Sequence, residues 1–560
     1  MKRKMIALFL AGAMCMTALA GCGGNETQTS QSTQGGDSGN NTASDAGSTG
    51  SADVAADSNF NETGYPIVND KITLKVMFAV RDSDSFMDFD EMPAVKRLEE
   101  QTNIDLEWEM VKASDWSTKL NLMFSSGEYP DLILASNGNG AVDDEEYGVT
   151  QGLLVPLDDY IQKYMPNYTA RIAAESSDPT VGMAASDGKV YSVGNLVGQN
   201  INTSAHTFIN QEWLTALGLS EPTTVDELTE VLRAFKTGDP NGNGQADEIP
   251  LEMGLDTGFT GFRYILPMFG IPADNDLWIY IDENKQVQFA PTQEGFRDAV
   301  EWLHQMYEEG LTDPEILSQD GNTVDSKLKE GNVGFFTLWR LIAMGMDDGV
   351  ASNSVCIMPP SAEGTNSLMH RTMEIAKPAA FVTCTNQNIP ATMRLLDAMI
   401  DTEMQFSLYY GEQDATDGTG WTYNENGKID SLDTNQADVL DHLGCNTLFF
   451  APGEYISSTF NMPPQRIEKT TYCKDYDAAG HIQKYSNDYL DVSPLTADQI
   501  AEASLTQTDI NSTVWEGVSN FVSQGVTDDS WNAFVGKFET MKVDEYMKMY
   551  QDAIDTMDIE

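Results

Sequence analysis

A loop rich in oxygen-bearing side chains lies between residues 237 and 250, and its spacing is that of a calcium-binding loop. The sequence reads TGDPNGNGQADEIP. An EF-hand loop takes oxygen ligands from relative positions 1, 3, 5 and 9 and has glycine at position 6 for a sharp turn. The residues at those four ligand positions are Asp239, Asn241, Asn243 and Asp247, and the glycine is Gly244. Because hard divalent cations prefer oxygen ligands, we expect a structural Ca²⁺ ion here.

The end of this loop departs from the EF-hand pattern. Gln245 at position 7 offers its backbone carbonyl, but position 12 is Pro250 rather than glutamate. The nearest acid able to act as a bidentate ligand is Glu248. The alternative interpretation is a turn held by Asn and Asp side chains bonded to the backbone. No second such loop accompanies the first, so a structural ion is expected and a calcium sensor is not.

Several tryptophans lie in polar loops, a pattern that indicates carbohydrate recognition. They are Trp278, Trp339 followed by Arg340, and Trp421 within GTGWTY. Indole rings stack on the apolar faces of sugars, while Arg, Asp and Asn bind hydroxyl groups. For each tryptophan the alternative is a place in a hydrophobic core, and Trp421, whose loop is rich in glycine, is the preferred ligand residue.

Catalytic templates are missing from the sequence. It contains no HExxH, GxSxG or GxxxxGK[ST] motif, and its five histidines are scattered. A pair of carboxylates of the glycosidase type is always conceivable among 87 acidic residues, but no spacing in sequence would identify one. We therefore expect a protein that is not an enzyme, with a cell-surface glycoside hydrolase as the alternative.

The elements that position these residues begin with an alternation of strands and helices. Strands are predicted at 71–80, 104–111 and 131–135, and helices at 93–102 and 116–126. This order predicts an α/β fold with a mainly parallel sheet, in which ligands gather at the carboxyl ends of strands. Asp82 and Asn137 follow two such ends and are candidate ligand residues.

Longer helices are predicted after residue 205. Thr224 and Glu227 form a capping box at the start of one helix, and another helix is predicted over 295–310. A last helix carries Val543, Met547, Tyr550 and Ile554 on one face. We interpret these apolar stripes as core.

The N-terminus predicts export and lipid attachment. A basic start is followed by an apolar run from Met5 to Ala20, too short to span a bilayer comfortably, and then by Leu-Ala-Gly-Cys22. This resembles a bacterial lipobox, which implies cleavage before Cys22 and a palmitate-containing lipid anchor on its thiol. Residues 1–21 are thus expected to be the signal peptide, 22–62 the lipidated Cys and a polar linker, and 63–560 the binding body.

Charge and cysteine content restrict the partners. The net charge is −55, which disfavours nucleic acid and anionic membrane surfaces. Beyond Cys15 and Cys22 there remain four cysteines without metal-ligand spacing, for which one or two disulfides or free thiols are both possible. They are Cys356, Cys384, Cys445 and Cys473.

An ordered series of short motifs resembles the extracellular solute-binding proteins that serve ABC transporters of oligosaccharides. The resemblance runs from about residue 71 to 560. Its marks, in order, are GEYPDL at 127–132, LLVPL at 153–157, DGKVY at 187–191, EWLTALGL at 212–219, PTTVDEL at 222–228, LKEGNVG at 328–334 and YGEQ at 410–413.

The resemblance implies a fold and a function. The fold is two-lobed and periplasmic-binding-protein-like, of type II, with a hinge and discontinuous lobes: lobe 1 about 65–200 plus a returning middle segment, lobe 2 most of 201–560. The loop is similar to that of alginate-oligosaccharide-binding proteins, which implies Ca²⁺ ligation by Asp239, Asn241, Asn243, Gln245, Asp247 and Glu248, with the acid at position 10 closing the site.

The expected function is the capture of an oligosaccharide, preferably a neutral one, and its delivery to ABC permease subunits. A peptide ligand remains the alternative within the same family. The protein is expected to be a monomer at the outer face of the cytoplasmic membrane of a Gram-positive cell, held there only by its lipid.

Overall fold

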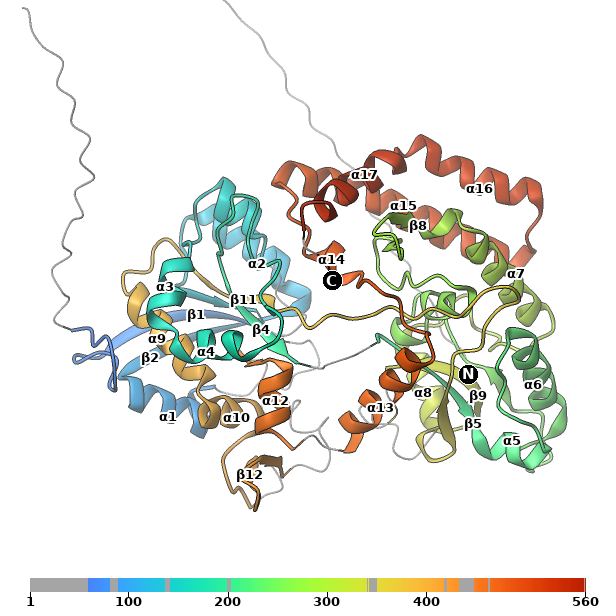
Figure 1. Ribbon diagram of the computed structural model, residues 1–560, viewed down its shortest axis with the longest axis horizontal. Coiled ribbons are helices and arrows are strands. Elements are labelled where there is room, and N and C mark those ends of the chain that lie inside the picture. Colours follow the sequence, from blue (N-terminus) through green and yellow to red (C-terminus); the bar gives the residue numbers. More distant parts are fainter. Residues whose placement is uncertain are drawn as a thin grey trace, which may run out of the picture. The chain divides into compact units, whose positions relative to one another are not determined.

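Two large β-sheets, each flanked by helices, organise the chain (Figure 1). The structure is a computed structural model, and it describes residues 59–80, 89–135, 142–198, 203–339, 341, 350–416, 420–432, 448–461, 464–557 and 559. Among these residues, no helix is long and apolar enough to cross a membrane.

The first sheet has six strands in the order β14-β4-β11-β3-β1-β2. Strand β1 pairs in parallel with β2 and β3, while β11 runs antiparallel to both β3 and β4. The strands are β1 Ile72–Val80, β2 Ile104–Lys112, β3 Leu132–Leu134, β4 Val193–Val197, β11 Lys377–Val382 and β14 Phe450–Ala451.

Alternation along β1 places its side chains in two separate cores. Phe78 and its same-side neighbours pack with α1 and α9, whereas Met77 and Ala79 face the opposite core with α2. The sheet is therefore buried on both faces, as a sheet with crossover helices requires. The surrounding helices are α1 Pro93–Thr102, α2 Ala113–Ser126, α3 Asp158–Tyr164, α4 Pro166–Ala174, α9 Ile389–Ile400, α10 Thr402–Tyr410 and α12 Gly453–Thr459.

The second sheet has four strands in the order β10-β5-β9-β6. Strand β9 runs antiparallel to β5 and parallel to β6, so the carboxyl ends of β6 and β9 lie at the same edge. The strands are β5 His206–Asn210, β6 Ile249–Leu251, β9 Val333–Leu338 and β10 Ser354–Ile357. Two small hairpins complete the described strands: β7 Ile279–Ile281 with β8 Val287–Phe289, and β12 Trp421–Tyr423 with β13 Ile429–Ser431.

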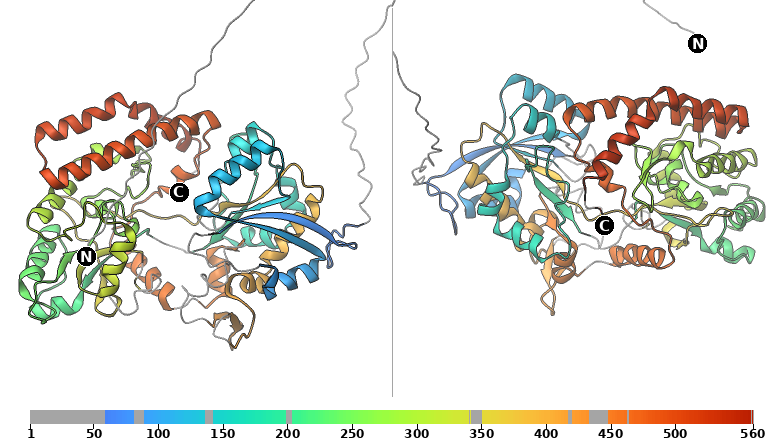
Figure 2. Two further views of the ribbon diagram at one scale, coloured as in Figure 1. Left: turned by 180° about the vertical axis from the view of Figure 1, so that it is seen from behind. Right: turned by 45° about the horizontal axis from the view of Figure 1, so that its top comes forward.

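One large core joins the second sheet to helices from distant parts of the sequence. The long C-terminal helices, drawn in red, lie beside α7 in Figures 1 and 2, and α7 and α15 share this core. The helices are α5 Gln211–Leu217, α6 Val225–Gly238, α7 Glu294–Glu308, α8 Gly321–Glu330, α13 Pro464–Ala478, α14 Asp488–Asp491, α15 Ala497–Gln524, α16 Asp528–Thr540 and α17 Val543–Ile554.

The chain passes between the two sheets more than once. Strand β4 of the first sheet is followed in the sequence by β5 of the second, with residues 203–205 directly before β5, and the chain returns through residues 358–376 before β11. We call these stretches the first and second crossing segments. It leaves the first sheet again after α12.

The predicted elements agree closely with the structure at the start of the fold. The predicted strands and helices of residues 71–135 correspond to β1, α1, β2, α2 and β3, and the capping box of Thr224 and Glu227 is formed at α6. The prediction of a mainly parallel sheet missed the antiparallel β11. This strand enters from the second sheet, so no local crossover helix fixes its direction.

Candidate functional site

The loop predicted to bind calcium joins α6 to β6. Asp239 ends α6 in the left-handed conformation (φ 46°), and both of its carboxylate oxygens accept from the Gly244 N–H at 3.1–3.2 Å. The Asn243 amide donates to both Asp247 oxygens at 3.1 Å, and the Asn241 amide donates to one of them at 3.2 Å. These bonds lower the pKa of Asp247. The loop therefore gathers the side chains that the spacing singled out.

A buried carboxylate oxygen of Glu248 indicates that this loop can hold a cation. Its Oε1 atom is buried and has no hydrogen-bond partner in the described part of the chain. Asp239, Asp247 and Glu248 together give three carboxylates within ten positions. The described residues hold no group of three His, Cys, Asp or Glu side chains already arranged around a metal, so the fit depends on amide and carbonyl oxygens as well. This mixed oxygen set is the type that Ca²⁺ takes.

A second feature is an aromatic stack at the carboxyl edge of the second sheet. Trp339 directly follows β9, and its ring stacks on Phe259 with centroids 6.3 Å apart and planes inclined by 22°. The Tyr264 ring also packs on Phe259, with the two ring centroids 5.6 Å apart. Carboxyl ends of strands are the usual location of ligand sites in α/β sheets.

A cavity of about 350 Å³ lies beside this stack. Its walls combine one aromatic ring with short hydroxyl, amide and carboxylate side chains, and they are Asp256, Thr257, Gly258, Phe259, Thr260, Gly321, Asn322, Asp325 and Leu338. Burial raises the pKa of Asp325. A flat ring beside groups that bond hydroxyls is the combination that binds a sugar.

Hydrogen bonds to strand β9 and within the loop fix the position of Phe259. The Thr337 hydroxyl donates to the Phe259 carbonyl at 2.7 Å, and the Thr260 hydroxyl donates to the Thr257 carbonyl at 2.9 Å. The Thr257 hydroxyl accepts from the Gly254 N–H at 3.2 Å. The loop is thus held to the strand that carries Trp339.

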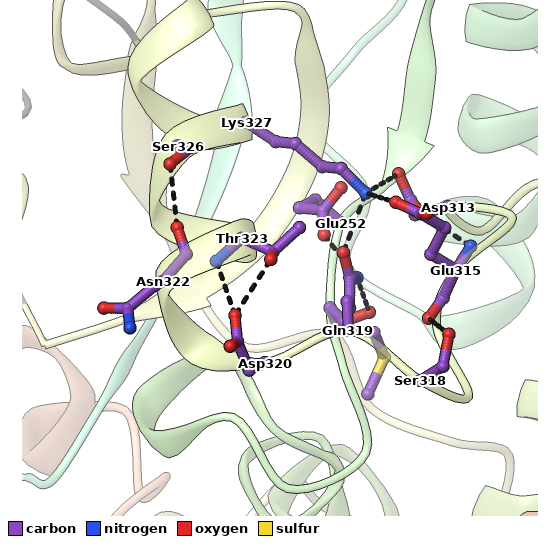
Figure 3. Close-up of polar contacts among 11 residues, drawn as sticks. Glu252, Asp313, Glu315, Ser318, Gln319, Asp320, Asn322, Thr323, Ser326 and Lys327 are labelled. Atoms are coloured by element: carbon purple, nitrogen blue, oxygen red, sulfur yellow. Dashed lines mark hydrogen bonds and ion pairs between the residues drawn. The ribbon is translucent and has the colours of Figure 1, made fainter. Parts of the chain in front are cut away.

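A buried polar network connects Glu252, which precedes this loop in the sequence, with Gln319, Asp313 and Lys327 (Figure 3). Glu252, fully buried after β6, accepts from the Gln319 amide at 2.8 Å, and that amide also donates to the Met253 carbonyl. Lys327 of α8 donates to Gln319 and Asp313, each at 2.8 Å. Burial and the nearby Asp313 charge raise the pKa of Glu252 to about 8. The network joins the loop after β6 to α8, which forms the opposite wall of the cavity.

The other two predicted tryptophans lie in cores. Trp421 is fully buried among Phe406 and its neighbours, and its indole N–H donates to the Ser407 hydroxyl at 3.1 Å. Trp278 is fully buried in the large core, and its N–H donates to Asn511 at 2.6 Å. Both indoles therefore take the alternative role considered for them, that of core residues. Neither lies in a core with Trp339.

The remaining predicted ligand residues and the anchor lie outside the described residues. These are Asp82, Asn137, Arg340 and Cys22. Cys356, Cys384 and Cys473 form no disulfide within the described part of the chain, and Cys445 lies outside that part.

The sequence interpretation did not select Phe259, Tyr264 or the loop that carries them. The available signal was the stretch DTGFTGFRY at 256–264, where aromatic residues alternate with glycine, threonine and aspartate as they do around Trp421. Only the pairing of β6 with β9 shows that this stretch lies next to Trp339.

Comparison with known proteins identifies the family of this chain. The model of the bacterial extracellular solute-binding proteins matches residues 83–406, more than half of the sequence. The chain belongs to this family.

Two curated proteins are similar to this chain over more than two thirds of its length. The fructooligosaccharide ABC transporter substrate-binding protein FusA of Streptococcus pneumoniae is 28% identical over 536 residues, which cover 90% of this chain and 94% of FusA. Lipoprotein LipO of Bacillus subtilis is 25% identical over 404 residues, covering 69% and 74%.

Solved structures show the same fold. FusA of S. pneumoniae in complex with kestose superposes with a TM-score of 0.75 at 24% identity, covering 86% of this chain and 99% of that one. An alginate-binding protein, AlgQ2 without calcium ion, reaches 0.66 at 20% identity, covering 88% and 100%. The two-lobed α/β fold of a solute-binding protein, predicted from the sequence, is confirmed.

Proposed function

We propose that this protein is the extracellular substrate-binding component of an ABC importer and that its ligand is a neutral oligosaccharide. The observation that carries the proposal is the Phe259–Trp339 stack beside a polar cavity at the carboxyl edge of β6 and β9. Family membership and the likeness to a fructooligosaccharide-binding protein support it. The protein releases the ligand unchanged and is not an enzyme.

Binding uses ring stacking and hydroxyl recognition together. The stacked rings cover the apolar face of a sugar unit, which excludes water from it. Asp256 and Asp325 accept hydrogen bonds from hydroxyl groups, and Asn322 both donates and accepts. Because the whole chain is acidic, a neutral sugar approaches with less long-range repulsion than an acidic one.

Capture of the ligand depends on two lobes. Lobe 1 contains the six-stranded sheet, with residues from about 65–200 and the segment that returns at β11; lobe 2 contains the four-stranded sheet and the C-terminal helices. A ligand that contacts both lobes favours the closed arrangement by the additional contacts made there. A permease then recognises the closed form. The protein works as a monomer.

The protein is held at the outer face of the cytoplasmic membrane through a lipid on Cys22. The basic and apolar residues before Leu-Ala-Gly-Cys support export and processing at this position. The polar stretch that follows up to residue 62 gives the binding body reach from the membrane.

Calcium stabilises lobe 2 through the loop between α6 and β6. Its ligands are the side chains of Asp239, Asn241, Asn243, Asp247 and Glu248 and the carbonyl of Gln245. The ion supplies positive charge to neighbouring carboxylates and fixes the loop, and it takes no part in ligand chemistry. Solved relatives include an EF-hand mutant of FusA.

Removal of calcium tests this site. Chelation should lower the melting temperature of the wild-type body by several degrees, and Asp239→Ala should abolish that difference, because binding to the folded state alone stabilises it. Differential scanning fluorimetry with and without chelator measures both. Asp475→Ala, a change at an exposed residue of α13, is the control and should keep the calcium response. A wild-type melting curve that chelator does not change would exclude the site.

A thermal-shift panel tests the ligand class. The body from residue 59 onward, at constant calcium, is melted with neutral fructo-, gluco- and galacto-oligosaccharides, with acidic uronate oligosaccharides and with short peptides. One neutral class should raise the melting temperature. At a ligand concentration one hundred times Kd, binding should add about 2.7 kcal/mol to the free energy of unfolding. A response to uronates or peptides alone would contradict the neutral-sugar assignment, and release of shorter sugars would contradict the binding role.

A further inference from the structure

His206 connects three separate parts of the second lobe. It is the first residue of β5 and is fully buried. Its Nδ1 lies 3.1 Å from the backbone carbonyl oxygen of Trp339. Its Nε2 lies 3.2 Å from the Thr203 hydroxyl of the first crossing segment and 3.4 Å from the Cys473 thiol of α13.

The chemistry of these partners fixes the proton on the ring. A carbonyl oxygen only accepts, so Nδ1 carries the hydrogen and donates to Trp339. In the neutral ring Nε2 is then an acceptor. The Thr203 hydroxyl is also within reach of the Ala205 carbonyl at 3.1 Å, and when it donates there the Cys473 thiol is the donor to Nε2. One tautomer therefore satisfies both ring nitrogens.

The ring has little freedom to leave this arrangement. Tyr472 and Tyr476 of α13 pack on it at centroid distances of 5.8 and 5.6 Å. His206 also pairs across the sheet with Leu338, the residue just before Trp339. Its side chain thus fixes the backbone at the point where β9 ends and the aromatic stack begins.

We infer that His206 is a positioning residue for ligand binding: its Nδ1–H holds the carbonyl of Trp339 and so aims the indole at the sugar. The inference rests on the proposed function, in which Trp339 contacts the ligand. It also makes the first crossing segment, through Thr203, and α13, through Cys473, part of the support of the binding platform. His206 itself does not touch the ligand.

Two substitutions distinguish the contribution of Nδ1 of His206 from that of Nε2. The amide nitrogen of Asn falls near the place of Nδ1, and that of Gln near the place of Nε2, so His206→Asn keeps a donor for the Trp339 carbonyl and His206→Gln does not. Both lose the ring packing and should lower the melting temperature similarly. Titration calorimetry with kestose should show affinity within about threefold of wild type for His206→Asn and about tenfold weaker for His206→Gln, the size expected for one hydrogen bond.

A spectroscopic measurement gives a readout that needs no ligand. With 5-fluorotryptophan incorporated, the ¹⁹F resonance of the indole at position 339, assigned from a Trp339→Phe variant, should move or broaden in His206→Gln and stay near its wild-type position in His206→Asn. Equal spectra for the two variants, or equal losses of affinity, would overturn the inference.

A double substitution distinguishes failure of this inference from failure of the proposed function. In a Trp339→Ala background, His206→Gln should weaken kestose binding no further, because the effect passes through the indole. A tenfold loss that persists in this background overturns the positioning role. Unchanged affinity for the bound sugar in Trp339→Ala alone, or no binding of any neutral oligosaccharide by the wild type, overturns the ligand assignment itself, while the ¹⁹F spectra still decide the positioning of the indole.

Discussion

Glu252 illustrates how a single buried carboxyl group supports the candidate site. It is fully buried, one of its oxygens has no partner among the described residues, and Lys327 is engaged by Asp313, Glu315 and Gln319 instead. Its pKa of about 8 keeps it protonated at neutral pH. At neutral pH, Glu252 therefore adds no negative charge to the network around Lys327.

This raised pKa has a defined effect on stability. The folded state holds the Glu252 proton up to about pH 8 while the unfolded chain releases it near the ordinary value of 4.5. The stabilisation is fully present below pH 4.5 and is lost as pH rises through about 8. Glu252→Gln cannot ionise, so it should exceed the wild type in stability by about 1–3 kcal/mol at pH 9 and lose the advantage toward pH 4.5.

Urea unfolding at several pH values between 4.5 and 9 measures this difference. Glu315→Gln is the matched control, because Glu315 binds the same Lys327 but its side chain is 64% exposed. It should change stability by about 0.5 kcal/mol or less at every pH. A Glu252→Gln variant with the same pH profile as the wild type would show that this carboxyl is ionised in the folded protein at neutral pH.

At the residue scale, the sequence could not predict which tryptophans are buried in a core and which lie near a ligand site. Trp278, Trp339 and Trp421 all have polar or glycine-rich neighbours, yet of the three only Trp339 stacks on a ring that lines the cavity, that of Phe259, while the other two are fully buried. Neighbouring residue types do not report burial, because partners such as Asn511 of Trp278 come from distant parts of the chain. The loop predicted to bind calcium differs, since all of its side chains lie within ten positions.

At the scale of elements, the second crossing segment is fixed by a buried ion pair. His370 lies in this segment, and its Nδ1 is 2.7 Å from a carboxylate oxygen of Asp274, with both side chains less than 10% exposed. Asp488 of α14 lies 3.7 Å from Nε2 and also accepts from the Met373 N–H. The segment is thus attached to the body of the second lobe just before it returns to the first sheet.

The charge state of His370 follows from its surroundings. Burial opposes the positive charge, but the charges of Asp274, Asp488 and Asp491 and the Asp274 hydrogen bond raise the pKa to about 9. The stabilisation is complete below the unfolded value of 6.5 and is lost as pH rises through about 9.

Replacement of His370 should therefore be costly at neutral pH. His370→Gln leaves Asp274 buried without its cation, and we expect a loss of about 3–5 kcal/mol at pH 7 that shrinks toward pH 9.5, where the wild type has also lost the charge. Calorimetric melting at the two pH values tests this. Asp488→Asn, which keeps an acceptor for Met373, should lose much less; an equal loss in both variants would assign the stability to packing rather than to the ion pair.

The sequence predicts elements well where the signals are local. Strands β1 to β3, their helices and the capping box at α6 were all recognisable from periodicity and turn residues. Strand β11 was not, because its antiparallel place between β3 and β4 depends on a return from the other sheet. The loop that carries Phe259 was not predicted as part of a ligand site for the same reason, because it lies next to Trp339 only through the pairing of β6 with β9.

At the scale of the whole molecule, charge and fold together favour one class of ligand. The chain carries a net charge of −55, and the cavity beside Trp339 has its own carboxylates, Asp256 and Asp325. The net charge repels acidic ligands at long range, whereas it does not repel neutral sugars. The two-lobed fold supplies the means to enclose such a ligand.

Titration calorimetry of the body from residue 59 onward with neutral fructo-, gluco- and galacto-oligosaccharides, kestose and nystose among them, followed by chromatography of the recovered sugar, tests the central claim most directly. The account predicts saturable binding of one sugar per protein, at least tenfold weaker binding in Trp339→Ala, and recovery of the sugar intact. Absence of heat with every neutral oligosaccharide, or recovery of cleaved sugar, would contradict it.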